Sequence, residues 1–463
     1  MIKEQARVPL ARMHMAQPTA QAKFVEGNLF RHITVMALTS SVGLMAIFAV
    51  DLVNIIFISM LGQEEFTAAI GYAGAILFFT TSFGIGLAIA VSALVARAVG
   101  QQNLALAREK ATSGLIIGIV FGVIFSAVVW VLLPQIVTLL GATGRTHELT
   151  VHFLRIVTPA QPFLMIGMIG GAILRSHGDA KRAMAATLWG ALANAILDPI
   201  LIFGLDLDLT GAAIASVVSR IVIAGVALLP IIKYHGGFDR PNRAGLRADL
   251  PVVFAIAGPA ILTQVATPVG QAVITRMVSD FGPAAVAGIA ISGRLTPVAL
   301  GIIFALSGAI GPIIGQNYGA GRMDRVRRAF LDGLLFTGIV IVAVSALLFI
   351  LRAPIADLFN AQGLTRDLVY LFCGPICLLF FFNGAIFVSN AACNNLGKPF
   401  TSTLINWGRH TFGTVPFALW LGQSYGAQGI VLGQAVGGIL FGILAVWLAL
   451  RIIDTAHAPS VKG

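Results

Sequence analysis

Long apolar runs of about 20 to 30 residues, separated by short polar segments, follow one another along nearly the whole chain. A helix needs about 20 mostly apolar residues to cross a bilayer. Twelve runs reach that length, near 33–60, 67–95, 111–140, 150–174, 182–204, 210–232, 251–279, 285–315, 329–351, 367–392, 399–421 and 428–450. The pattern predicts an all-α polytopic membrane protein with twelve transmembrane helices and no soluble domain.

The chain also repeats itself at an offset of about 219 positions. The matching pairs include Gly100 and Gly319, Arg108 and Arg327, Gly114 and Gly333, and Gly178 and Gly397. A repeat unit of six spans gives both halves the same orientation, which is the parallel type of transporter repeat with a substrate site between the halves. We therefore predict two six-helix lobes related by a pseudo-two-fold axis. The predicted segments are a tail 1–32, an N lobe 33–232, a linker 233–249, a C lobe 250–451 and a tail 452–463.

Composition agrees with a membrane protein, because 57% of the residues are hydrophobic and only 11% are charged, against roughly 25% charged in soluble domains. The net charge of +11 does not indicate nucleic-acid binding. Twenty-two of the 30 Lys and Arg residues lie in the two tails and in alternate loops. Basic loops stay in the cytoplasm, so we expect both termini there, with the chain in the bacterial inner membrane. The same basic residues are expected to contact anionic lipids.

Two acids lie deep inside apolar runs, Asp51 in the first span and Asp198 in the fifth. An ionisable residue at membrane depth is costly and is interpreted first as functional. Asn194 shares a helix face with Asp198, and Ser216 lies in a run of small residues in the sixth span. If these three helices meet, the four side chains could hold H⁺ or Na⁺. The alternative is that the acids only fix helix packing through local hydrogen bonds.

The C lobe has no such acids, but it carries polar residues within its spans. They are Asn383, Asn390 and Asn394 on the tenth, Gln264 and Gln271 on the seventh, and Arg294 on the eighth. They could line a substrate cavity. They could equally make hydrogen bonds between helices, with Arg294 as a structural anchor.

Enzyme motifs are not found. The chain has no phosphate-binding loop of the G-x-x-x-x-G-K-[ST] type. His147 and His152 are five residues apart, one too many for a zinc-binding pair on one helix face. The three cysteines are expected to be packing residues. We therefore predict a non-enzyme without a cofactor, and without a metal site other than a Na⁺ site at Asp51 and Asp198.

Several motifs together resemble the multidrug and toxic compound extrusion (MATE) family over residues 30–450. They are Asp51-Leu52-Val53 followed by Gly62, the glycine-rich loop 315–321, the segment 175–181, and Asn194 with Asp198-Pro199. The resemblance implies a V-shaped fold of twelve helices and export of organic, often cationic drugs in exchange for H⁺ or Na⁺. It is strongest with the DinF-like branch, whose cation site matches Asp51, Asn194, Asp198 and Ser216.

Two features depart from the family. The NorM-like branch carries further carboxylates where this chain has Thr267 and Ala385, so a second cation site is not expected. Many members have a proline early in the first helix, and this chain has none between Ile33 and Leu61.

The function predicted from the sequence is a multidrug efflux antiporter, acting as a monomer on small drug-like molecules and not on nucleic acid. The nearest alternative is a flippase of the same wider superfamily that moves lipid-linked precursors. Such a flippase would need a strongly cationic cavity. A membrane-embedded receptor or enzyme is a more distant alternative.

Overall fold

The computed structural model describes residues 22–456, and its regular structure over that range is entirely helical. Residues 1–21 and 457–463, which belong to the two predicted tails, lie outside the described range. The first half of the chain forms α1 (Leu29–Met60), α2 (Glu64–Gly100), α3 (Leu104–Leu139), α4 (Gly144–Val157), α5 (Gln161–Ser176), α6 (Ala180–Pro199) and α7 (Asp208–Tyr234). The second half forms α8 (Arg243–Ser279), α9 (Pro283–Ala299), α10 (Gly301–Gly319), α11 (Met323–Leu358), α12 (Gly363–Leu371), α13 (Cys377–Leu379), α14 (Phe381–Asn395), α15 (Pro399–Gly408) and α16 (Val415–Thr455).

These helices give the twelve predicted spans within the described range. Nine helical segments are long and apolar enough to cross a bilayer, and two bent pairs, α9 with α10 and α12–α13 with α14, bring the number to eleven. The last segment, Pro399–Thr455, has 57 residues, far more than one crossing needs. It reverses direction at Gly426, which has a φ of 60°, and the two arms pack against each other through Gly429 and Gly433. It therefore holds the eleventh and twelfth spans.

Polar side chains fix where several helices begin. Asn28 accepts a hydrogen bond from the backbone N–H of Arg31 at the start of α1, and Asn103 accepts one from Leu106 at the start of α3. Such capping satisfies backbone donors that have no partner within the helix. The short polar segments between the apolar runs thus set the helix boundaries.

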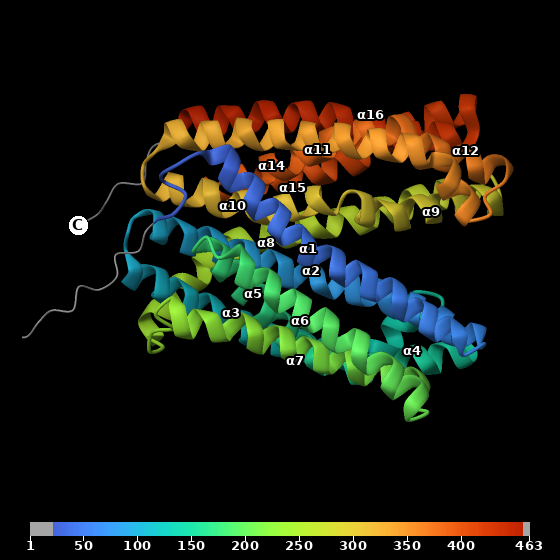
Figure 1. Ribbon diagram of the computed structural model, residues 1–463, viewed down its shortest axis with the longest axis horizontal. Coiled ribbons are helices and arrows are strands. Elements are labelled where there is room, and N and C mark those ends of the chain that lie inside the picture. The colour runs from blue at the N-terminus through green and yellow to red at the C-terminus, as the bar shows by residue number, and fades with distance from the viewer. Residues whose placement is uncertain (1–21, 457–463) are drawn as a thin grey trace, which may run out of the picture.

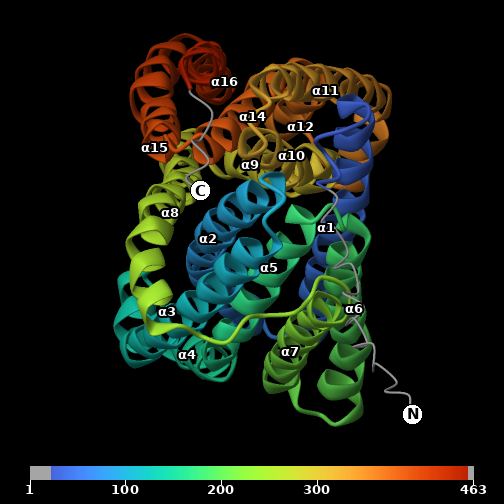
Figure 2. The same ribbon diagram turned by 90° about the vertical axis from the view of Figure 1, so that its left-hand side faces the viewer.

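The helices form two lobes, seen end-on in Figure 2, with α2–α7 in one group and α9–α16 in the other. The first helix of each repeat crosses between them. In α1, Ile33 and Met36 pack with Ile310 and Phe330 of the C lobe, whereas Ile58 belongs to an N-lobe cluster. Figure 1 shows α1 running obliquely from one lobe to the other.

The helix α8 makes the equivalent crossing from the opposite side. Its early residues Val253 and Ile256 pack in the N-lobe core, and its late residues Ile274 and Val278 pack in the C lobe. The two crossing helices therefore tie the lobes together in a manner that follows the sequence repeat. We call the end of the bundle near residues 22 and 456 the proximal end, and the other the distal end (Figure 1).

At the proximal end the lobes are joined by hydrogen bonds. The fully buried side chain of Gln316, near the end of α10, donates to the carbonyl oxygen of Ser176 at 2.7 Å and accepts from the backbone N–H of Phe24 at 2.9 Å. From the other lobe, Arg97 of α2 donates through Nε to the carbonyl oxygen of Asn395 at 2.9 Å. The proximal end is thus closed in this structure.

Candidate functional site

The helices α1 and α6 run side by side from the proximal toward the distal end (Figure 1). Gly43 of α1 lies directly against the side chain of Thr187 on α6. Farther along, the rings of Phe57 and Phe203 meet edge to face with centroids 5.8 Å apart. The predicted acids of both helices lie between these two contacts.

Helix geometry places Asn54 opposite Asp198. From Gly43 to Asn54 and from Thr187 to Asp198 the separation is the same, 11 residues. Each corresponds to a rise of about 16 Å and a net rotation of only about 20°. Since Gly43 and Thr187 face each other, this spacing predicts that Asn54 and Asp198 lie at a similar depth on facing sides of the two helices. Asn54 was not among the predicted site residues, because its position relative to Asp198 follows only from the contact between Gly43 and Thr187.

Asn194 and Asp198 form a buried pair one helical turn apart. They are 8% and 1% exposed, and the Asn194 amide donates to Oδ2 of Asp198 at 2.5 Å. The other carboxylate oxygen, Oδ1 of Asp198, has no hydrogen-bond partner among the described residues, and neither does the buried Oδ1 of Asn54. Two buried acceptor oxygens without a partner could serve as ligands for a cation or hold a proton.

Asp51 lies near this pair but in a different environment. Its carboxylate is within electrostatic range of Asp198, yet its residue is exposed whereas Asp198 is enclosed. The two acids, which look equivalent in the sequence, therefore differ in their surroundings. Two carboxylates within electrostatic range of each other could share a single proton or cation.

Ser216 lies on α7, at the level of the Asn194–Asp198 pair. Gly211 packs on the backbone of Leu201, and Ser219 donates to the carbonyl oxygen of Gly190 at 2.8 Å. These two contacts set the register of α7 against α6, and Ser216 lies between the two contacts along α7. Ser216 is half-buried, so the structure brings it to the same level of the bundle without a direct bond to either acid.

The asparagines predicted to line a cavity in the C lobe make hydrogen bonds between helices. Asn390 is 9% exposed and accepts from the Asn406 amide at 3.2 Å, and Asn394 is 4% exposed and accepts from Ser402 at 3.4 Å. Asn383 is half-buried and accepts from the guanidinium of Arg409. The sequence allowed these asparagines either to line a substrate cavity or to make hydrogen bonds between helices. Their geometry agrees with hydrogen bonds between helices.

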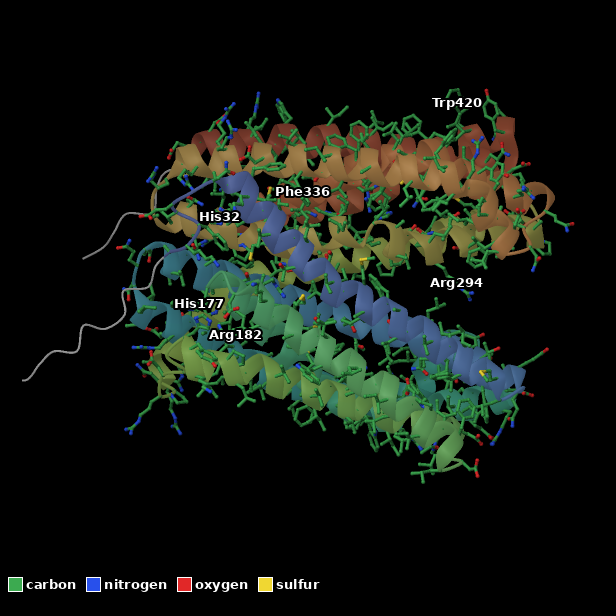
Figure 3. All side chains as sticks on the ribbon, viewed as in Figure 1. His32, His177, Arg182, Arg294, Phe336 and Trp420 are labelled. Carbon is green, nitrogen blue, oxygen red and sulfur yellow. The ribbon has the colours of Figure 1, made fainter. Side chains whose placement is uncertain are left out.

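The other C-lobe candidates are more open. Gln271 is exposed and accepts a 3.4 Å hydrogen bond from Gln434, and Gln264 is half-buried. Arg294, labelled in Figure 3, is exposed on α9 and makes no ion pair within the described residues. These three side chains remain candidates for substrate contact.

The C lobe also holds a buried cationic residue that was not among the predicted site residues. Arg409 and its neighbour His410 are each 7% exposed, on a π-helical turn, Arg409–Gly413, between α15 and α16. The arginine lies in the middle of the eleventh apolar run, so an inventory of charges within each run would have found it.

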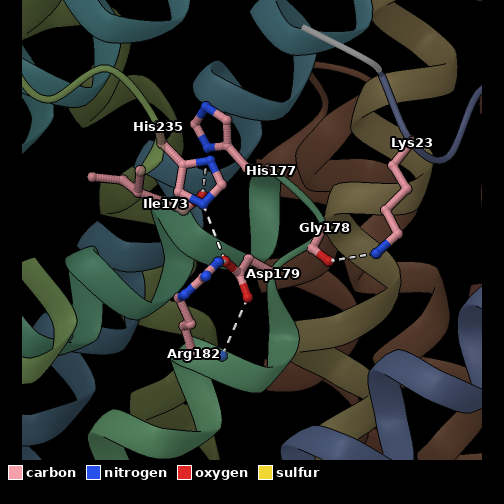
Figure 4. A network of polar contacts seen from close by, with 7 residues as sticks. All are labelled: Lys23, Ile173, His177, Gly178, Asp179, Arg182 and His235. Carbon is pink, nitrogen blue, oxygen red and sulfur yellow. Dashed lines mark hydrogen bonds and ion pairs between the residues drawn. The ribbon is translucent and has the colours of Figure 1, made fainter. Parts of the chain in front are cut away.

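A further polar cluster joins helix ends outside the spans at the proximal end (Figure 4). Asp179 accepts from Arg182 at 2.5 Å and contacts Nε2 of His235 at 3.1 Å. Burial alone would raise the pKa of Asp179, but the hydrogen bonds from His235 and Arg182 outweigh it and hold that pKa well below its usual range. Burial lowers the pKa of the adjacent His177 to about 4. This cluster belongs to the closed proximal end and not to the α1–α6 site.

Comparison with known protein families agrees with the repeat and the fold. The family model described as MatE matches residues 39–200 and again 259–420, once in each lobe. Among solved structures, a MATE transporter from Vibrio cholerae superposes with a TM-score of 0.87 at 24% identity, covering 91% of this chain and 96% of that one. A MOP superfamily transporter from Pyrococcus furiosus superposes with a TM-score of 0.86 at 20% identity, covering 94% and 98%.

Curated relatives carry two kinds of name. A protein named FAD transporter from Shewanella oneidensis is 30% identical over 92% of this chain and 95% of its own length. Multidrug export protein MepA from Staphylococcus aureus is 22% identical over 93% of this chain and 96% of its own length.

Proposed function

Because the chain belongs to the MATE family of membrane transporters, we propose that it is a secondary antiporter that exports small organic molecules in exchange for H⁺ or Na⁺. The observation that supports this most directly is the buried Asn194–Asp198 pair, whose second carboxylate oxygen has no hydrogen-bond partner among the described residues. A cation bound there interacts with helices that belong to both lobes, because α1 crosses between them. Its binding and release would therefore bias the arrangement of the lobes.

The driving force is sufficient for this task. One elementary charge moving through about 150 mV releases roughly 3.5 kcal/mol. That energy supports a substrate gradient of a few hundredfold. No covalent chemistry or bound cofactor is needed.

The curated relatives indicate two different substrate classes, drug-like molecules and a flavin nucleotide. The MepA relatives favour drug-like molecules, and the resemblance to the family favours organic cations among them. The Shewanella oneidensis relative favours a flavin nucleotide, which is an anion. Uptake of ethidium and of FAD into the same proteoliposomes separates these two classes.

We further propose that the proximal end faces the cytoplasm of a bacterial inner membrane and that the protein acts as a monomer. Charge supports the orientation, because few basic residues lie near the distal helix ends of the described chain, Arg145, Arg276, Arg352 and Arg366 among them, whereas most Lys and Arg residues lie in the tails and the proximal segments. Labelling of single cysteines from each side of intact cells tests this orientation.

The test of coupling uses purified protein in proteoliposomes with separately imposed ΔpH and Na⁺ gradients. We expect Asp198→Asn and Asp51→Asn to lose gradient-driven transport while the proteins still fold and insert. The exposed Asp280, which pairs with Arg276 near the end of α8, provides the control, and Asp280→Asn should transport normally. Full gradient-driven transport by both Asp51→Asn and Asp198→Asn would refute the coupling mechanism. Movement of lipid-linked precursors without any gradient would favour the flippase alternative.

A further inference from the structure

Arg409 and His410 form a buried pair of ionisable side chains that the cation-coupling site does not use. Their π-helical turn packs against α8, α15 and α16. Within the described residues, no Asp or Glu lies within 4 Å of the Arg409 guanidinium. A buried arginine without a carboxylate is costly, and ionisable groups within spans mark functional sites by default.

The contacts of the pair leave specific donors free. Arg409 donates through Nη1 to Oδ1 of Asn383, and through Nη2 to Nε2 of His410 at 2.6 Å. Because Nε2 of His410 accepts, the proton of the neutral ring lies on Nδ1. Neither this Nδ1–H nor the Nε–H of Arg409 has a partner among the described residues. Nδ1 of His410 lies against the backbone of Gly270, so the Nε–H of Arg409 is the enclosed donor available for an acceptor from outside the protein.

Small residues surround the pair and leave room for it. Gly270 of α8 lies against the His410 ring, so that any side chain at position 270 would overlap the imidazole. Gly437 of α16 lies beside Thr414, whose buried hydroxyl also has no partner within the described range. Widened π-helical turns of this kind occur frequently at functional sites.

The two lobes differ in the charge of their enclosed polar groups. The N lobe holds Asp198 with Asp51 nearby, and its buried Arg220 donates to the carbonyl oxygen of Val157. The C lobe holds Arg409 and His410, and its buried Asp332 is paired with Arg328. Arg409 thus differs from Arg220 in keeping an unpartnered N–H among the described residues. The planar arginine fork matches the geometry of phosphate and carboxylate oxygens. We infer that Arg409, positioned by Asn383 and His410, binds the oxyanion of an exported organic anion, so that the C lobe selects substrates by a negative group. This inference rests on the proposed export function and specifies its substrate class.

Direct binding tests the inference without any ion gradient. FAD differs from riboflavin by a pyrophosphate and an adenosine, whereas FMN differs from riboflavin only by a phosphate. Weaker binding of both FAD and FMN, with riboflavin unchanged, therefore isolates the anion. With purified full-length protein in detergent free of anionic lipid, we expect Arg409→Gln to weaken FAD binding at least tenfold and to leave riboflavin binding unchanged. Arg276→Gln, which removes an exposed arginine of α8, should bind FAD as the unaltered protein does.

A second variant covers the case in which Arg409→Gln does not fold. Asn383→Asp places a carboxylate at the position that already accepts from Arg409, so it should stabilise the folded protein and exclude the ligand anion. Equal FAD affinity in the unaltered protein and in a folded Arg409→Gln or Asn383→Asp variant would overturn the inference. So would the absence of FAD binding to the unaltered protein.

Phosphate could also come from a lipid headgroup, and added phosphatidylglycerol separates the two sources. Little competition with FAD supports a small-molecule site, whereas binding of the lipid in place of FAD overturns the assignment to substrate. Ethidium export driven by a gradient, together with no FAD binding, would leave the proposed antiporter intact and refute only the anion site. FAD binding without any gradient-driven transport would support the anion site and refute the proposed antiporter.

Discussion

Gly100 and Gly319, which occupy equivalent positions in the two repeats, each pack against the backbone of the opposite lobe. A methyl group at Gly100 would overlap the carbonyl oxygen of Gln316, and one at Gly319 would overlap the carbonyl oxygen of Arg97. The ends of α2 and α10 therefore meet with no side chain between them. This reciprocal contact lets the closed proximal end form.

The first prediction follows from that contact. Gly100→Ala should destabilise the closed proximal end and increase the fraction of molecules open there, because the added methyl group must displace backbone. Ser176, fully buried at this end, is a suitable reporter as Ser176→Cys in a background without the three native cysteines. We expect its maleimide labelling rate to rise severalfold in Gly100→Ala. Gly74→Ala, in the same helix with no atom near the new methyl group, should label at the control rate. Equal rates in all three proteins would contradict a role for the contact in closure.

The second prediction concerns the segment that precedes α1. Nη2 of Arg325 donates to the carbonyl oxygens of Phe24, Glu26 and Gly27 at 3.0, 3.2 and 3.1 Å. Phe24 is 1% exposed, so the peptide bond after Lys23 is protected from trypsin. Arg325→Gln should release the segment and accelerate that cleavage, as measured by mass spectrometry of the fragments.

A matched control exists in the same helix. Arg327 is more than half exposed and pairs with Asp454 at 3.5 Å. Arg327→Gln removes one arginine without touching the segment, so its cleavage after Lys23 should match that of the unaltered protein. If Arg325→Gln is cleaved no faster than Arg327→Gln, these hydrogen bonds do not hold the segment.

Most of the fold follows from the sequence because membrane helices obey strict rules. Apolar length predicts each span, since backbone groups in lipid must be satisfied within the helix. The glycine repeat predicts the two lobes. The structure explains why glycine recurs at positions 100 and 319, because each packs against the backbone of the opposite lobe. The crossing of α1 and α8 between lobes could not be predicted, because it depends on which apolar faces meet and all faces of such helices are similarly apolar.

The candidate site was predictable in part. Asp198 and Asn194 stand out as polar residues at helical spacing within an apolar run. The pairing of Asn54 with Asp198 requires knowing that Gly43 meets Thr187, which is a tertiary contact without a sequence pattern. The exposure of Asp51 likewise depends on how α1 is rotated between the lobes. Arg409 was not predicted as a site residue, although an arginine in the middle of an apolar run is a candidate by its position alone.

The third prediction is a pH dependence of stability at the proximal end. Burial lowers the pKa of His177 to about 4 in the folded protein, against about 6.5 in an unfolded chain. Between these values the unfolded chain binds a proton that the folded protein does not, so the free energy of unfolding falls as pH drops. Between pH 7 and pH 5 the loss is about 2 kcal/mol. Asp179 has a lowered pKa, so its contribution is lost only below about pH 4 and does not affect this window.

Thermal unfolding in detergent at pH 7 and pH 5 measures this effect. The melting temperature of the unaltered protein should fall more over that interval than the melting temperature of His177→Gln. His152→Gln, at an exposed position of the distal half, should retain the full pH dependence. An identical drop in His177→Gln and in the unaltered protein would show that another group is responsible.

The last prediction tests whether the α1–α6 contact sets the geometry of the cation site. A methyl group at Gly43 would overlap the hydroxyl of Thr187, so Gly43→Ala should push the helices apart and separate Asn54 and Asp51 from Asp198. Displacements of about 1 Å at a functional site can cost a hundredfold in rate, and we expect gradient-driven transport to fall roughly tenfold or more. Gly43→Ala combined with Thr187→Ala removes the overlapping atoms and should recover most of the transport. Recovery in the double variant ties the loss to helix spacing, since Thr187 lies about 16 Å along α6 from Asp198. Equal loss in the single and double variants would indicate that Gly43 acts through backbone flexibility of α1, which contains no proline between Ile33 and Leu61, and not through this contact.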